Sequence, residues 1–305
     1  MDKIKIICVV GATASGKTAL GVELAKRLGG EVISADSMQV YKGMPVATAV
    51  ATEEEKEGIP HYLTEFLDVD ETFSVADFVR LAKERAIEIH SRGKVPIIVG
   101  GTGLFIDSLV NNIIFADVEA CDDIRKSLNE KDTDELYGEL MRVDPEAAKL
   151  IHKNNRKRVI RALELYYGGV SKTEQNERSR EEESPFEALY IFINYADRQK
   201  LYERINKRVD IMLENGLVEE AREMLEKQGV TARQAIGHKE LKGYIDGELS
   251  LEEAAENLKK ETRHYAKRQL TWFRKNENAA VLMADSMTRE ELYDAAQALS
   301  REFLG

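Results

Sequence analysis

Apolar and polar positions alternate in blocks along the first third of the chain. Short apolar runs rich in β-branched residues predict strands at 4–10, 31–34, 61–66 and 95–99. Helical spacing predicts helices at 19–28 and 74–92, with Ser74 as an N-cap and Gly93 just past the end. This alternation is typical of a parallel α/β sheet flanked by helices, with ligand-binding loops at the carboxyl ends of its strands.

The pattern changes near residue 113. Polar segments with helical spacing fill 117–167 without a convincing strand, and a strand pattern returns at 189–195. We therefore predict a helical insertion domain at 113–185, within a core made of 1–112 and 186–305. The last third of the chain predicts helices at 197–226, 251–275 and 288–303, and a strand at 279–283.

Charge is distributed unevenly along the sequence. The chain has 305 residues and a formal net charge of −11, which by itself disfavours binding to nucleic acid. Lysine and arginine nevertheless concentrate in two segments, 153–180 and 259–275. A polyanion responds to the charge within a Debye length, so these two segments are candidate RNA-binding surfaces.

Several classes of protein are disfavoured. No apolar run approaches the length of a membrane span, and the apolar N-terminal stretch is too short for a signal peptide. Two cysteines, Cys8 and Cys121, make no disulfide framework, and we predict Cys8 as a core residue of a cytosolic (cytoplasmic) protein. The five histidines are scattered without paired cysteines, so the sequence predicts no zinc site.

The octapeptide Gly11–Thr18 carries the strongest chemical signal. It fits the phosphate-binding pattern G-x-x-x-x-G-K-[ST], between a predicted strand and a predicted helix. That order aims backbone N–H groups and the positive end of a helix at an anion; Lys17 adds a charge, and the Thr18 hydroxyl can hold Mg²⁺. We expect phosphate binding by the whole loop: Gly11, Ala12, Thr13, Ala14, Ser15, Gly16, Lys17 and Thr18. The loop does not reveal which ligand it holds.

Two further turns follow strands at the same predicted edge. Asp36 comes directly after the second strand, where its carboxylate could bind Mg²⁺, hold a sugar, act as a base or cap a turn. Nearby, Gln39 could read an adenine edge. Residues 100–103 read Gly-Gly-Thr-Gly, which offers flexible backbone and the Thr102 hydroxyl, or simply a turn that closes a strand.

Basic helices provide the remaining candidates. In the segment 259–275 we place a basic stripe outward and an apolar stripe toward the sheet. The basic stripe consists of Lys260, Arg263, Lys267 and Arg274, and the apolar one of Leu258, Tyr265 and Trp272. A second basic cluster, Arg156–Arg158 with Arg161, lies in the insertion, and both clusters favour RNA as a partner. Arg208, on another predicted helix, could bind phosphate or belong to a solvated face.

Taken together, the motifs resemble the tRNA dimethylallyltransferases of the bacterial type, also called tRNA isopentenyltransferases. The matching segments run in the same order: GATASGKT, ISADSMQVYKGM, RGKVPIIVGGTGLF, NNRKRVIRALE, QAIGHKE and TRHYAKRQLTWFR. The resemblance implies a P-loop sheet and a reaction in which a dimethylallyl group moves from dimethylallyl diphosphate to N6 of the adenosine immediately 3′ of a tRNA anticodon. Pyrophosphate would leave, and Mg²⁺ would be needed.

The resemblance also assigns residues. Asp36 would be the general base, Thr102 would sit at the reaction centre, Arg208 would clamp pyrophosphate, and 13–18 would hold the diphosphate. The positions that we assign to tRNA binding are Asp36, Ser37, Met38, Gln39, Thr102, Arg125, Arg158, Arg161, Arg263 and Lys267. We expect a monomer with no membrane contact.

The chain departs from the family pattern in places. Ala12, Phe105 and His238 stand where Pro, Tyr and Tyr are usual. Residues 45–51 read PVATAVA where the family reads close to DIGTAKP, so Val50 replaces a lysine. This replacement leaves room for reduced activity or an altered choice of substrate.

Three alternatives remain open from the residues. The phosphate loop alone would also suit a small-molecule kinase or a nucleotide hydrolase. The altered stretch 45–51 would suit an RNA-binding protein that has lost catalysis. Prenylation of free adenine nucleotides would suit the same motifs, although the basic insertion disfavours it because a free nucleotide needs no such surface.

Overall fold

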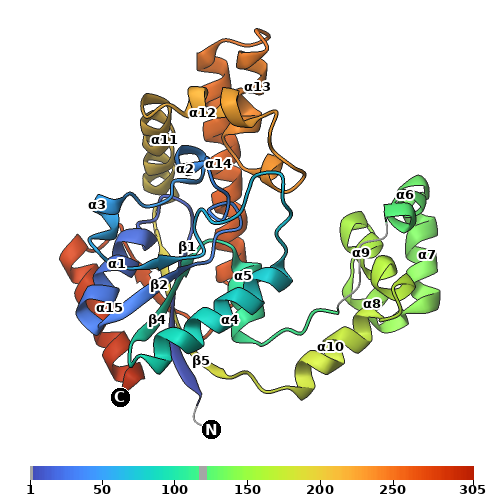
Figure 1. Cartoon of the computed structure of the whole chain (residues 1–305), viewed down its shortest axis with the longest axis horizontal. Coiled ribbons are helices and arrows are strands. Elements are labelled where there is room, and N and C mark those ends of the chain that lie inside the picture. Colours follow the sequence, from blue (N-terminus) through green and yellow to red (C-terminus); the bar gives the residue numbers. More distant parts are fainter. Residues whose placement is uncertain (1–2, 117–121) are drawn as a thin grey trace. The chain divides into compact units, whose positions relative to one another are not determined.

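The computed structural model describes residues 3–116 and 122–305 (Figure 1). It divides into two compact units, one comprising 1–110 and 185–305 and the other 111–184. The sequence pattern placed the insertion at 113–185. Cys121 lies outside the described residues. Among the residues that are described, no helix combines the length and apolarity that crossing a membrane requires.

The larger unit is built on one six-stranded sheet in which every strand pair is parallel. The strands, in the spatial order β3-β2-β4-β1-β5-β6, are β1 (Ile4–Gly11), β2 (Gly30–Ser34), β3 (His61–Tyr62), β4 (Val95–Gly100), β5 (Phe186–Asn194) and β6 (Ala280–Met283). Ile7, Ile97 and Ile191 are fully buried, as expected for a parallel sheet covered on both faces. The predicted α/β fold is confirmed, and Cys8 is a buried core residue as predicted.

The register of the central strands positions the loops that follow them. Val10 of β1 pairs with Gly100 of β4, and Ser34 of β2 pairs with Val99 of β4. The carboxyl ends of these three strands are therefore nearly level. The phosphate loop, the turn at Asp36 and the Gly-Gly-Thr-Gly segment consequently meet at one edge of the sheet.

The helices of the larger unit are α1 (Lys17–Leu28), α2 (Pro45–Thr48), α3 (Glu53–Lys56), α4 (Val75–Ser91), α5 (Gly103–Val110), α11 (Arg198–Glu214), α12 (Leu217–Met224), α13 (His238–Ile245), α14 (Leu251–Phe273) and α15 (Arg289–Leu304), with a 3₁₀ turn at Ala232–Gln234. Ser74 begins α4 as predicted, in a reciprocal pair of hydrogen bonds with Asp77. Ser250 and Thr288 begin α14 and α15 in the same way.

Two predicted elements were wrong in extent, and backbone geometry explains both. The helix expected over 197–226 is two helices, because Gly216 adopts a left-handed φ of 90° between α11 and α12. The strand expected over 61–66 is only His61–Tyr62, because Leu63 and Glu65 adopt left-handed φ angles of 62° and 50°.

The smaller unit is helical throughout its described secondary structure. Its helices are α6 (Asp122–Glu130), α7 (Thr133–Val143), α8 (Pro145–Leu150), α9 (Arg156–Tyr167) and α10 (Lys172–Glu181). Its core contains Leu128, Leu136, Leu140, Val159 and Leu163, all at most 2% exposed. This unit therefore has a hydrophobic core of its own.

Candidate active site

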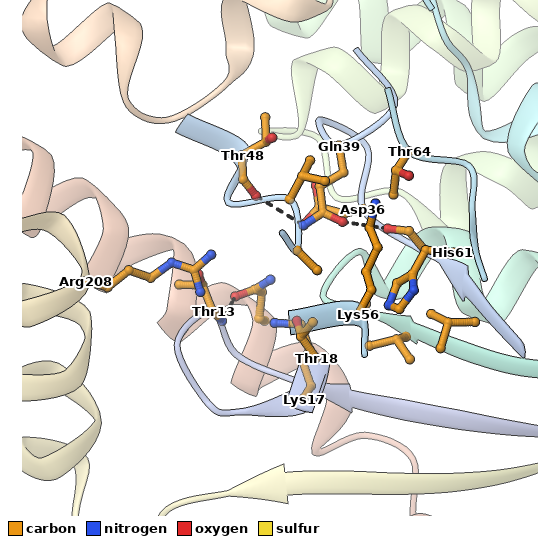
Figure 2. Close-up of a pocket in the computed structure, with 17 residues that line it drawn as sticks. Thr13, Lys17, Thr18, Asp36, Gln39, Thr48, Lys56, His61, Thr64 and Arg208 are labelled. Atoms are coloured by element: carbon orange, nitrogen blue, oxygen red, sulfur yellow. Dashed lines mark hydrogen bonds between the residues drawn. The ribbon is translucent and has the colours of Figure 1, made fainter. Parts of the chain in front are cut away.

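A pocket lies at the edge of the sheet where β2 and β4 end and α1 begins (Figure 2). Its phosphate side consists of Thr13, Lys17, Thr18 and Arg208. Its opposite wall consists of the lining residues contributed by the segment 45–64, which are Thr48, Val50, Ala51, Lys56, His61 and Thr64. Asp36 and Gln39 also line the pocket, and in Figure 2 they lie between Arg208 on one side and His61 on the other.

The phosphate loop has the backbone geometry of an anion site. Gly16 adopts a left-handed φ of 97° at the start of α1, and the first turn of that helix holds no acidic side chain. Lys17 Nζ donates to the Ala12 carbonyl at 3.0 Å. Burial and, to a smaller extent, the charge of Arg208 lower the pKa of Lys17, Asp36 opposes both, and the net value is about 8. An ammonium group in this position is stabilised by any anion that enters.

Arg208 reaches the pocket from α11. Burial lowers the pKa of its guanidinium, and the charge of Asp36 acts in the other direction. Its neighbour Arg204 instead donates from Nε to the Ala14 carbonyl at 2.9 Å, which fixes the loop backbone. Helical spacing alone does not separate these two arginines, and only the family resemblance points to Arg208; in the structure Arg208 lines the pocket, while Arg204 is bonded to the loop backbone.

Asp36 both closes a turn and lines the pocket. Its Oδ1 accepts a hydrogen bond from the Met38 N–H at 3.0 Å. Its charge also acts on the pKa values of Lys17 and Arg208, and all three residues line the same pocket. The two readings left open by the sequence, a cap and a pocket residue, therefore hold together. Neither Ser37 nor Met38 is among the residues that line the pocket.

The side chain of Gln39 is fully engaged within the protein. Its Oε1 accepts from the Ser34 hydroxyl at 2.8 Å, and its Nε2 donates to the carbonyls of Thr48 and Ala49, both at 3.2 Å (Figure 2). These bonds tie the wall segment to the end of β2. To read an adenine edge, Gln39 would have to exchange these partners for the base.

The Gly-Gly-Thr-Gly segment owes its glycines to close packing rather than to backbone flexibility. None of Gly100, Gly101 and Gly103 has a positive φ. A Cβ atom would lie 2.1 Å from the Ala35 carbonyl oxygen at Gly100, 2.0 Å from Gln269 Nε2 at Gly101, and 2.2 Å from the Trp272 ring at Gly103. The Ser37 N–H donates to the Thr102 hydroxyl at 3.2 Å, which joins this segment to the Asp36 turn.

Helix α14 supplies a pocket residue that the sequence reasoning missed. Gln269 is 4% exposed, accepts from the Thr13 N–H at 2.8 Å and donates to the Gly101 carbonyl at 3.0 Å. The stripe expected to be simply apolar thus makes polar contacts as well: Tyr265 hydrogen-bonds with Thr102, and Trp272 Nε1 donates to Asp107 at 2.7 Å. A glutamine within a mainly apolar helical stripe was the available signal.

The opposite wall contains three further residues that sequence reasoning did not single out: Lys56, His61 and Thr64. Lys56 pairs with Glu53 at 2.6 Å. His61 Nδ1 lies 2.9 Å from the Ile59 carbonyl, while its Nε2 is buried without a partner in the described structure. Burial lowers the pKa of His61. The neutral imidazole therefore presents an unused acceptor nitrogen.

The two divergent regions, 45–51 and His238, are joined in one buried network. The Glu220 carboxylate accepts from the N–H groups of Val46 and Ala47 at 2.8 and 2.9 Å, at the start of α2. His238 Nε2 lies 2.7 Å from Glu220 Oε1, and Gln228 Nε2 lies 2.6 Å from His238 Nδ1. Glu220 therefore anchors the wall, and the substituted histidine anchors Glu220.

The basic stripe of α14 is only partly as predicted. Lys260, Lys267 and Arg274 are exposed. Arg263 is wrongly placed in the outward stripe, because it donates to Asn206 Oδ1 at 2.6 Å and is half-buried against α11. Lys267 remains available to a polyanion.

The candidate arginines of the smaller unit also fall into two groups, those whose side chains are bonded within the protein and one whose side chain is exposed and unbonded among the described residues. Arg125 and Arg161 both pair with Glu164, at 2.9 and 3.2 Å. Arg156 donates to the carbonyls of Asn129 and Lys131 at 2.9 and 2.6 Å and so closes the end of α6. Arg158 is exposed, and its side chain makes no hydrogen bond or ion pair with the described residues.

Known families and proteins match the chain over most of its length. The family model described as IPP transferase matches residues 39–276. The chain is 49% identical over 300 residues to a tRNA dimethylallyltransferase of Acetivibrio thermocellus, with 95% of each chain covered. It is 46% identical over 279 residues to the tRNA dimethylallyltransferase of Bacillus subtilis, with 89% of this chain and 88% of that protein covered.

Solved structures match as well. A full-length tRNA isopentenylpyrophosphate transferase from Bacillus halodurans has a TM-score of 0.74 at 41% identity, covering 99% of this chain and 97% of that one. A eukaryotic dimethylallyltransferase, described as acting on tRNA, has a TM-score of 0.83 at 31% identity, covering 99% of this chain and 79% of that one.

Proposed function

The chain belongs to the IPP transferase family, and we propose that its pocket carries out the transfer of a dimethylallyl group to tRNA. One observation carries the proposal for the site. The Asp36 carboxylate lines the same pocket as Lys17, Thr18 and Arg208, so a base and an anion site open onto one space. A P-loop kinase could use the same carboxylate to hold a metal ion, and the family match favours the transferase.

Dimethylallyl diphosphate is the donor that suits this pocket. Its diphosphate would lie against the phosphate side, where Lys17 and Arg208 provide positive charge. Breaking the allylic C–O bond leaves a new negative charge on pyrophosphate, which these preorganised cations stabilise as it develops. Val32, Val50 and Val99 line the same pocket and suit a short branched hydrocarbon.

Asp36 is the proposed general base toward N6 of adenosine. The exocyclic amine is a weak nucleophile, because its lone pair is delocalised into the ring. In the transfer a C–N bond forms, the allylic C–O bond breaks, and one amine proton moves to the Asp36 carboxylate. The Thr102 hydroxyl, held by Ser37 and Tyr265, is the proposed neighbour of the reacting amine.

The residues present fit Mg²⁺, which the proposed reaction requires. The Thr18 hydroxyl and the Asp36 carboxylate offer hard oxygen atoms to the pocket. Among the described residues no group of three or more His, Cys, Asp or Glu side chains could hold a metal, which suits an ion bound mainly through a diphosphate and water. When bound, Mg²⁺ would supply positive charge to the leaving group. Thr18 is the residue that we assign to it.

The acceptor is proposed to be the adenosine 3′-adjacent to the anticodon. A paired or stacked base must leave its stack to enter a pocket, so recognition falls to the loop shape and the backbone. Lys267 on α14 and Arg158 in the smaller unit are exposed cations suited to phosphate contacts. The monomeric state and the cytosolic location stay predictions.

A transfer assay tests the proposal. Labelled dimethylallyl diphosphate, Mg²⁺ and unmodified tRNA should yield labelled tRNA, while free AMP should accept little label. Labelled AMP instead of tRNA would assign the protein to nucleotide prenylation. Rapid ATP turnover without tRNA would indicate a kinase or hydrolase, and tRNA retention without transfer would indicate a binding protein that has lost catalysis.

A further inference from the structure

The Gln269 side chain connects the two loops that the proposed reaction must hold together. Its amide oxygen accepts from the Thr13 N–H in the phosphate loop at 2.8 Å, and its amide nitrogen donates to the Gly101 carbonyl beside Thr102 at 3.0 Å. The orientation of the amide is dictated by its partners, because a backbone N–H can only donate and a carbonyl can only accept. Only a side chain with one donor and one acceptor satisfies both loops.

The surroundings leave this connection little room to adjust. Gln269 is 4% exposed, so water is a poor substitute for either partner. A Cβ atom at Gly101 would lie 2.0 Å from Gln269 Nε2. One turn away on the same helix, Tyr265 hydrogen-bonds with Thr102, and on the next turn Trp272 is held by Asp107. The inner face of α14 is therefore fixed against both loops.

We propose that Gln269 is a positioning residue that sets the distance between the diphosphate loop and the Thr102 turn. This inference rests on the proposed function, since it concerns the alignment of the leaving group with the incoming amine. Because Thr13 gives its N–H to Gln269 and Ser15 gives its N–H to the Ala12 carbonyl, a diphosphate would have to use other N–H groups of the loop. A misalignment of about 1 Å costs a transfer reaction on the order of 100-fold in rate.

The Gln269→Met variant tests the proposal, because methionine has a similar length and makes neither hydrogen bond. Single-turnover transfer should fall about 100-fold, while tRNA affinity stays within a factor of about two. Gly101→Ala should push the amide away and give a similar loss. The double variant should lose little more than either single one, because both changes break the same connection.

The matched control is Gln175→Met, which removes an equally buried glutamine from the smaller unit. It should lower Tm comparably and leave single-turnover transfer at saturating tRNA nearly unchanged. The proposal is overturned if Gln269→Met transfers within about threefold of the unaltered protein, if the double variant is fully additive, or if the control loses as much rate.

Hydrogen exchange provides a readout that needs no transfer. Inorganic pyrophosphate should slow amide exchange in residues 100–104 of the unaltered protein and fail to do so in Gln269→Met. Equal protection in both proteins would overturn the positioning role while leaving the diphosphate site intact. Absence of transfer and of pyrophosphate binding in the unaltered protein would instead count against the proposed function.

Discussion

The two sides of the pocket differ in how their polar groups are compensated. On the phosphate side, burial and neighbouring arginine charges lower the pKa values of Lys17 and Arg208, and the Asp36 charge opposes this for both groups. On the opposite wall, the backbone polar groups of residues 46–49 are paired within the protein: Gln39 donates to the carbonyls of Thr48 and Ala49, and Glu220 accepts from the N–H groups of Val46 and Ala47. One side is poised to take up an anion, and the other mainly keeps its shape.

The largest effect should come from Asp36, which lies between these two sides. Asp36→Asn preserves the size of the side chain and an oxygen for the Met38 N–H, but it removes the base. Single-turnover transfer should fall by about 100- to 10 000-fold, while filter binding should show that tRNA is still retained. Normal turnover by this variant would refute the role of base.

The wall should respond to loss of its anchor mainly in stability. Glu220→Ala leaves the Val46 and Ala47 N–H groups and His238 without an acceptor, so the free energy of unfolding should fall by about 3 kcal/mol in urea titrations. The exposed neighbour Glu219 provides the control, since Glu219→Ala should be nearly neutral. Equal losses in both variants would remove the distinction between an anchored wall and an ordinary surface.

The phosphate side should respond to pH instead. With the pKa of Lys17 at about 8 in the folded protein, protonated lysine is lost as pH rises from 7 to 9, and donor affinity should fall about tenfold. Lys17→Arg should flatten this profile beyond the titration of the diphosphate itself. An identical profile in both proteins would mean that Lys17 does not bind the diphosphate as a cation.

The lowered pKa of Lys17 also makes the stability of the protein depend on pH, and stability changes in the direction opposite to donor affinity. Because the folded pKa lies below the unfolded value near 10.5, protonated Lys17 disfavours the folded state below pH 8. Its contribution to the free energy of unfolding becomes more favourable as pH rises from 8 toward 10.5. Affinity and stability thus move in opposite directions over this range.

The smallest effect should separate two arginines of the smaller unit. The Arg158 side chain has no partner among the described residues, whereas the Arg161 side chain pairs with Glu164. Arg158→Ala should weaken tRNA binding several-fold and reduce the slope of log affinity against log salt by about one. Arg161→Ala should change both less. The reverse ranking would show that a paired arginine exchanges its partner for RNA.

The sequence predicted the parts of the site that depend on short segments. Lys17, Thr18 and Asp36 could be placed because each follows a recognisable strand, and the parallel register brings strand ends to one edge. Gln269 could not be placed in this way, because it meets Thr13 across 256 residues of sequence. The Glu220–His238 contact also depends on packing between helices, which periodicity does not specify.

The position of Gln39 limits how this pocket can change. Its side chain donates to the carbonyls of Thr48 and Ala49, while its backbone carbonyl accepts from the Glu65 N–H at 2.8 Å. Glu65 and nearby Leu63 both adopt a left-handed backbone conformation. The turn that contains Thr48 and the turn that contains Thr64 are therefore both hydrogen-bonded to Gln39. A replacement at residue 39 would remove the side-chain bonds to Thr48 and Ala49 but keep the backbone bond to Glu65. A change in the acceptor or donor range through residue 39 would therefore have to include compensating exchanges at residues 48 and 49.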